Sequence, residues 1–233
     1  HSDPRDENQF QKRKSSLMSE SYWIYAVGLA AQLLFSARLI IQWIRSEQSG
    51  RVLSPTIFWQ LSLIASFLLI AYGILRDDPI IIFGQVISYF IYIRNLQYKG
   101  AWKLIPPYFK VIVLLFPIAT ILWLAGSTEH SWNDVIGNPS ISNILLIWGA
   151  LGQIVFALRF VYQWYFSEKL KKSVLPLGFW IISMVGSLLI VSYGFFRYDP
   201  ILILGQAFGI IAYARNIQIG LQAKKVKMEA KPL

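Results

Sequence analysis

The sequence predicts an all-α integral membrane protein with seven transmembrane helices, arranged as two parallel three-helix repeats joined by a linker helix (3+1+3). Three observations support this prediction. The 233 residues are 55% hydrophobic with a mean hydropathy of +0.49, too apolar for an ordinary soluble domain. Apolar runs of about 20 residues, the length that crosses a bilayer, recur along the chain. The second half of the chain also repeats the first.

Seven segments are long and apolar enough to be predicted as spans. They run over Tyr22–Ile44, Pro55–Leu75, Pro79–Gln97, Pro107–Ala125, Ile141–Phe166, Leu175–Phe196 and Pro200–Leu221. The fourth is interrupted by Lys110 and Pro117, but its length and apolarity still favour a crossing.

The loops between these spans alternate in charge. Lysine and arginine follow the first, third, fifth and seventh spans, whereas the opposite loops hold only Arg76 and Arg197 as basic residues. The positive-inside rule then places the N-terminus outside and the C-terminus in the cytoplasm. Residues 1–17 contain the basic run "QKRK" and contradict this pattern. We expect them to be an added or disordered tail that lies outside the fold.

Composition also restricts the chemistry. The chain has no cysteine, and His1 and His130 form no metal or catalytic constellation, so we expect no metal and no cofactor. The predicted spans hold no nucleophile–base pair and no paired carboxylates, so we expect the chain not to be an enzyme. The net charge of +10 lies in short loops beside the spans, which indicates membrane orientation and predicts no nucleic-acid partner.

The internal repeat is strong. A shift of 121 residues aligns Tyr25–Tyr98 with Leu146–Ile219 without a gap, and about 27 of the 74 positions are identical. The matches are mostly polar or aromatic, for example "QW..SE", "P..FW", "YG..R.DP" and "Y.RN.Q", whereas chance matches between apolar helices would favour aliphatic residues. The fourth span restores the chain direction, so the copies are predicted to be parallel, a symmetry that some transporters use.

The predicted organisation follows from the repeat. It comprises a tail over 1–17, a first repeat over 18–103, a linker helix and outer loop over 104–138, a second repeat over 139–223 and a basic cytoplasmic tail over 224–233.

The motifs carry a resemblance. "Q..F..R...QW..SE", "P..FW" and "YG..R.DP....GQ.......Y.RN" resemble the lipid A biosynthesis N-terminal domain family, here in two tandem copies, and the 3+1+3 plan resembles the SWEET transporters of the PQ-loop clan. The resemblance implies a bacterial inner-membrane protein of envelope glycolipid metabolism. In that family the domain also occurs fused ahead of lipid-A-disaccharide synthase. No glycosyltransferase domain follows here, so we do not expect the synthase activity to carry over.

Polar side chains form stripes along the predicted helices, because residues three and four apart share a face. One stripe, in both copies, holds Gln32, Arg38 and Gln42 with Gln153, Arg159 and Gln163; another holds Gln85, Tyr92 and Asn95 with Gln206, Tyr213 and Asn216. Ser62, Ser66, Ser183 and Ser187 suit ordinary interhelical hydrogen bonds, and the glutamines fit either that role or a ligand.

Arg38 and Arg159 need an anionic partner if they face the interior, because charge is costly in a bilayer. The predicted spans contain no Asp or Glu, and Glu47 lies nine residues beyond Arg38 on the far side of its helix end. A ligand phosphate, which guanidinium binds in a fork geometry, is the simpler partner, and two such arginines could bind one phosphate or a diphosphate. Arg94 and Arg215 lie nearer the interface, where they could anchor the helices or join the site.

The motifs "RDDP" and "RYDP" suggest a structural role. Asp78 and Asp199 suit helix N-caps, Pro79 and Pro200 suit the first helical positions, and Arg76 and Arg197 are placed to pair with these carboxylates. An external headgroup site is the alternative.

Three functions remain open from the sequence. The favoured one is a flippase-like transporter of a phosphate-bearing envelope lipid, most simply a polyprenyl-phosphate sugar or a lipid A related glycolipid, with the paired arginines on the phosphate. A SWEET-like carrier of a free sugar would leave those arginines without a role. A non-transporting membrane partner of an envelope glycosyltransferase explains the repeated polar stripes less well.

Overall fold

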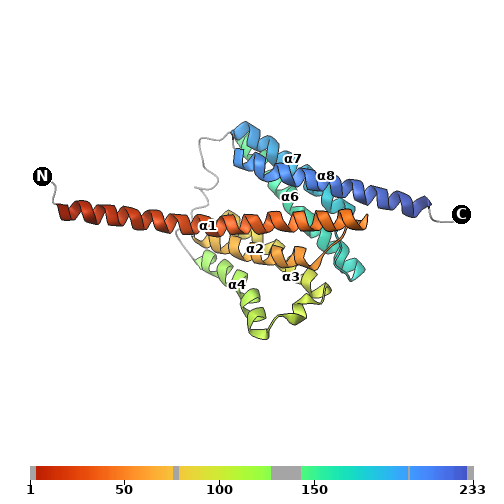
Figure 1. The fold of residues 1–233 in the computed structure, drawn as a ribbon, viewed down its shortest axis with the longest axis horizontal. Helices are drawn as coiled ribbons and strands as arrows, with labels where there is room; N and C mark the ends of the chain where they lie inside the picture. Colours follow the sequence, from red (N-terminus) through yellow and green to blue (C-terminus); the bar gives the residue numbers. More distant parts are fainter. Residues whose placement is uncertain (1–3, 76–78, 127–142, 199, 230–233) are drawn as a thin grey trace.

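The protein is all-helical over the residues that its structure, a computed structural model, describes: 4–75, 79–126, 143–198 and 200–229 (Figure 1). The elements are α1 (Pro4–Ser49), α2 (Thr56–Leu75), α3 (Pro79–Tyr98), the short 3-10 helix η1 (Ala101–Leu104), α4 (Pro107–Gly126), α6 (Asn143–Leu170), α7 (Leu177–Arg197) and α8 (Pro200–Glu229). The predicted all-α class is confirmed.

Four helical segments in the described part of the chain are long and apolar enough to cross a membrane: Tyr22–Ser49, Thr56–Leu75, Pro107–Gly126 and Leu177–Phe196. They correspond to the first, second, fourth and sixth predicted spans. Helices α3, α6 and α8 correspond to the third, fifth and seventh predicted spans. The membrane layout of seven spans remains a prediction.

Helix α1 is longer than the sequence indicated. It begins at Pro4, so residues 4–17, which we expected to lie outside the fold as a tail, continue the helix. Glutamate, glutamine, lysine and arginine are good helix formers, and the chain has no glycine or proline between Pro4 and Gly28, so nothing in this stretch stops the helix.

The two repeats fold into two similar three-helix bundles. Helix α2 packs against α1 and α3, and α7 packs against α6 and α8. In both copies a glycine of the first helix faces a tyrosine of the second. A Cβ atom on Gly28 would lie 2.9 Å from the Tyr72 ring, and one on Gly149 would lie 2.9 Å from the Tyr193 ring. Since real Cβ atoms do not approach so closely, a larger residue at either position would displace the tyrosine ring.

Helix α4 belongs to the first bundle. The Phe116 ring stacks 4.1 Å from that of Phe67 on α2, and the Tyr89 hydroxyl on α3 donates to the Val113 carbonyl at 2.9 Å. That carbonyl is the one left free by Pro117, which has no N–H to donate four residues back. Tyr89 therefore replaces the missing helical bond. Its counterpart in the second repeat is Ile210, which has no such hydroxyl.

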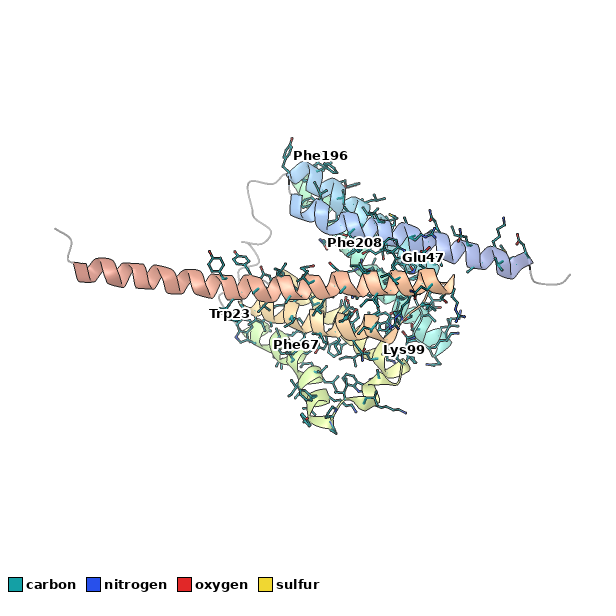
Figure 2. The ribbon with its side chains drawn as sticks, in the orientation of Figure 1. Trp23, Glu47, Phe67, Lys99, Phe196 and Phe208 are labelled. Carbon is teal, nitrogen blue, oxygen red and sulfur yellow. The ribbon has the colours of Figure 1, made fainter. Side chains whose placement is uncertain are left out.

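The bundles meet through α1 with α8 and through α3 with α6, so the first helix of each repeat packs on the third helix of the other. The contact is closest toward the end where α1 stops, and the bundles diverge toward the other end (Figure 1). We term the first of these the basic end; it holds Arg45, Arg51, Lys99, Lys103, Lys169, Lys171 and Lys172. Figure 2 shows Glu47 and Lys99 there, with Trp23 and Phe196 toward the opposite end.

Helices α3 and α8 begin at Pro79 and Pro200, which confirms these prolines as first helical residues. The expected pairing of Arg76 and Arg197 with Asp78 and Asp199 lies outside the described residues, as does His130.

Candidate functional site

Two reciprocal amide pairs join the repeats at the basic end. Gln42 on α1 donates to Asn216 Oδ1 on α8 at 2.8 Å, and Asn216 Nδ2 donates back to Gln42 Oε1 at 3.1 Å. The other copy repeats this bond, since Asn95 Nδ2 donates to Gln163 Oε1 at 3.0 Å and Gln163 Nε2 donates to Asn95 Oδ1 at 2.9 Å. All four side chains are fully buried.

Each glutamine is bonded further within its own repeat. Gln42 donates to Ser46 and to the Leu53 carbonyl, at 2.9 and 3.2 Å. Gln163 does the same with Ser167 and the Val174 carbonyl, at 2.7 and 2.8 Å. The protein thus supplies these amides with partners, which gives Gln42, Gln163, Asn95 and Asn216 a structural role. Their predicted contact with a ligand remains a prediction.

Two ion pairs lie beside the amides and also cross between repeats. Arg94 on α3 bonds Glu168 at the end of α6, with Nη2 3.0 Å from Oε2, and the Tyr98 hydroxyl donates to the same oxygen at 2.6 Å. Arg215 on α8 pairs with Glu47 on α1 in the same way. Glu168 lies beyond the predicted fifth span, and its bonds with Arg94 and Tyr98 lower its pKa to about 2.

We name this set the inter-repeat clamp: Gln42, Glu47, Arg94, Asn95, Gln163, Glu168, Arg215 and Asn216. Sequence reasoning missed it because Glu47 was considered only against its own repeat. The signal was present, since the glutamate of "QW..SE" and the arginine of "Y.RN.Q" are both duplicated. The predicted interfacial arginines Arg94 and Arg215 therefore have carboxylate partners.

Arg38 and Arg159 lie on the same faces of α1 and α6, one helical turn before the clamp glutamines. Only 5% and 7% of their surfaces are exposed. Arg38 donates from Nη1 to Ser62 Oγ at 2.6 Å and to the Tyr92 hydroxyl at 3.2 Å. Arg159 lies beside Tyr213, the counterpart of Tyr92. None of the ion pairs in the described part of the chain includes either arginine.

Aromatic rings surround both guanidinium groups. The Arg38 carbon Cζ lies 4.5 Å from the centre of the Phe35 ring, and that of Arg159 lies 3.2 Å from the centre of Phe156. Both also face Phe160, at 5.5 and 4.8 Å. One ring therefore lies against both cations, which places them in a single layer. A cation–π contact that is shielded from water contributes about 2 kcal/mol. The ring faces therefore offset part of the cost of burying the two cations.

The arginine layer holds donors that the protein does not satisfy. Arg38 Nε, Arg159 Nε and Arg159 Nη1 are buried and have no hydrogen-bond partner. A fourth buried nitrogen without a partner, Trp180 Nε1, has a simple cause: its counterpart Trp59 bonds Ser54, and Leu175 occupies the position of Ser54 in the second repeat. Buried N–H groups without acceptors are rare in proteins. Two uncompensated guanidinium groups can bind an oxyanion.

The remaining predicted residues lie apart from this layer. Gln85 and Gln206 accept hydrogen bonds from Ser66 and Ser187, at 3.0 and 2.7 Å, within their own repeats. Gln32 lines an open hollow of about 570 Å³ between α1 and α2. Gln153 is exposed on α6. The structure therefore brings the two arginines together with Tyr92 and Tyr213. The other four predicted glutamines, Gln32, Gln85, Gln153 and Gln206, have different surroundings.

Comparison with known proteins agrees with the duplication. The family model described as the Lipid A Biosynthesis N-terminal domain matches residues 27–97 and again 148–218. The two matches are offset by the shift seen in the sequence, so the predicted tandem copies are confirmed. No solved structure matches the chain.

Relatives that match over most of this chain are named Lipid-A-disaccharide synthase. The protein of Chlamydia muridarum is 30% identical over 208 residues, 84% of this chain and 34% of its own length. That of Chlamydia pneumoniae is 30% identical over 205 residues, 85% of this chain and 33% of its own length. The chain therefore spans about a third of these relatives. From the sequence we expected that the chain is not an enzyme. That expectation was wrong, because the relatives that it matches are named as an enzyme.

Proposed function

The chain belongs to the lipid A biosynthesis N-terminal domain family, and we propose that it moves the headgroup of a phosphate-bearing envelope lipid across a membrane. The lipid is a polyprenyl-phosphate sugar or a lipid A related glycolipid. The headgroup passes between the two bundles while its tail stays in the bilayer.

One observation carries this proposal: two buried arginines lie in one layer with unpaired N–H groups, and neither forms an ion pair among the described residues. Two like charges in a low-dielectric interior repel, and the described residues around them contribute rings and hydroxyls rather than carboxylates. A phosphate between them would supply both the missing charge and the missing acceptors. The family and its relatives provide the lipid context.

The groups around this layer suit a sugar phosphate. The Tyr92 and Tyr213 hydroxyls adjoin the guanidinium groups and can bond to phosphate or sugar oxygens. A free neutral sugar, the SWEET-like alternative, would leave both arginines uncompensated. This alternative therefore has weaker support.

A second candidate role comes from the relatives. Their matched region is about a third of a protein named Lipid-A-disaccharide synthase. The same arginine layer could hold a lipid for a synthase that acts beside it, without moving the lipid. A transport assay separates the two roles, because lipid binding without translocation would support the second one.

We also propose that the basic end faces the cytoplasm of the bacterial inner membrane, with the N-terminus outside. The exposed lysines of the α6–α7 connection support this through the positive-inside rule. The chain lacks cysteine, so a Lys171→Cys variant can be labelled at one site. A membrane-impermeant maleimide should label it only after the cells are opened, and labelling in intact spheroplasts would refute this orientation.

The transport proposal is tested in vesicles that contain the purified protein. Translocation of a polyprenyl-phosphate hexose should exceed that of the free hexose, and the Arg38→Gln/Arg159→Gln variant should abolish it. Arg45→Gln/Arg51→Gln is the matched control, because both of these arginines are exposed at the basic end. It should transport the lipid at the wild-type rate. A buried double variant that folds and transports normally would contradict the proposal.

A further inference from the structure

The arginine layer is less symmetric than the sequence repeat. Arg38 and Arg159 are equivalent by the 121-residue shift, yet Arg38 has two hydroxyl acceptors on Nη1, Ser62 and Tyr92. Arg159 has no partner on Nη1 or on Nε. Ser62 and its counterpart Ser183 both donate to a carbonyl of their own helix, Phe58 at 2.5 Å and Phe179 at 2.6 Å, and Ser62 in addition accepts from Arg38. Two of the layer's three unpaired guanidinium nitrogens thus belong to one residue.

The aromatic rings around the two arginines are also unequal between the repeats. Phe160 replaces Leu39 of the first repeat, and its ring is the one that both arginines face. This ring also packs edge-on against Tyr92 at 5.2 Å and against Phe179 at 5.5 Å. The second repeat therefore supplies both the less satisfied cation and the ring shared by the two cations. The first repeat supplies a cation that its own hydroxyls hold in place.

We infer that the layer binds a single phosphate group, held mainly by Arg159, with Arg38 in a supporting position. This inference rests on the proposed function, and it narrows the proposed substrate to a lipid that carries a single phosphate group at the site. Three unpaired nitrogens, Arg38 Nε with Arg159 Nε and Nη1, suit the terminal oxygens of one phosphate. A diphosphate would bury further charged oxygens without donors, which is strongly unfavourable.

Binding of farnesyl monophosphate and farnesyl diphosphate to the detergent-purified full chain tests this inference by calorimetry. The monophosphate should bind more tightly. Arg159→Gln should weaken its binding about 100-fold, as expected for the loss of a buried charge-assisted contact, and Arg38→Gln about tenfold. Arg159→Lys keeps the charge without the planar fork, so it should lie between wild type and Arg159→Gln.

The controls separate folding from binding. Arg51→Gln, at an exposed position, should change affinity about twofold or less, and each variant must elute as wild type does in size-exclusion chromatography. Equal losses in Arg38→Gln and Arg159→Gln would overturn the asymmetry and leave the phosphate site standing. Tighter binding of the diphosphate would overturn the single-phosphate inference. Absence of binding of both probes by the wild type would overturn the proposed function as well.

Discussion

The inter-repeat clamp and the arginine layer lie one helical turn apart and are built from similar polar side chains. In the clamp, each buried glutamine is bonded to an asparagine of the other repeat, and each arginine has a glutamate partner. In the arginine layer the two guanidinium groups meet rings and hydroxyls instead of carboxylates. The clamp side chains therefore bond one another, whereas in the part of the chain that the structure describes three guanidinium nitrogens of the arginine layer have no acceptor.

This difference makes opposite predictions for stability. Removing a clamp partner leaves a buried polar group unpaired, which costs free energy. Removing an uncompensated buried charge relieves a cost, and apolar replacement of buried ionic groups is often stabilising. Substitutions in the two regions should thus change the free energy of unfolding with opposite signs.

The largest effect should come from the clamp. Asn95→Leu removes the reciprocal bonds to Gln163 and should lower the free energy of unfolding by about 2 kcal/mol. Thermal unfolding in detergent measures this change. Asn216→Leu is the symmetric control and should cost the same within error, because its bonds to Gln42 are equivalent. Unchanged stability in both variants would mean that the amide pairs do not hold the repeats together.

A smaller effect of the opposite sign is expected in the arginine layer. Arg159→Met keeps the side-chain length and removes the charge, so it should raise the free energy of unfolding by about 1 kcal/mol. The same thermal assay, without lipid phosphate, detects the gain. Arg38→Met should gain less, because it also loses the bonds to Ser62 and Tyr92. Destabilisation by Arg159→Met would show that the layer is a structural element like the clamp.

The smallest effect concerns the ion pairs of the clamp. Glu168 is partly exposed, so Glu168→Gln should cost no more than about 1 kcal/mol. Its pKa is lowered to about 2 by Arg94 and Tyr98, so its stabilising contribution is present above the ordinary glutamate pKa and is lost only as the pH falls toward 2. The wild-type advantage over Glu168→Gln should therefore stay constant between pH 5 and pH 8. A decline within that window would contradict the pairing.

The helical class and the duplication could be predicted from the sequence, because apolar length and repeated motifs are local properties. Within the predicted tail, residues 4–17 continue α1 as a helix, and their place outside the fold remains a prediction. The hydrogen bond of Tyr89 could not be predicted from the sequence either, because its acceptor is a carbonyl on another helix that Pro117 leaves without a helical donor.

Within the candidate site, the sequence identified the residues but not their division of roles. Gln42, Arg38 and Gln32 share one stripe on α1, and periodicity treats them alike. In the fold, Gln42 bonds Asn216 in the clamp, Arg38 is buried, and Gln32 lines an open hollow. Glu47 was discounted because its partner lies 168 positions along the chain. A stripe specifies which face is polar, but not which partner it meets.

The sequence by itself determined that this protein is helical and duplicated, and that Arg38 and Arg159 occupy equivalent positions in the two copies. Those features follow from composition and spacing along one chain. Only the tertiary structure decided that the clamp residues bond one another across the repeats and that, among the residues it describes, no carboxylate pairs with Arg38 or Arg159. The physical reason is that charge compensation depends on contacts between distant segments, and Phe160 brings both cations to one ring only when the two bundles pack.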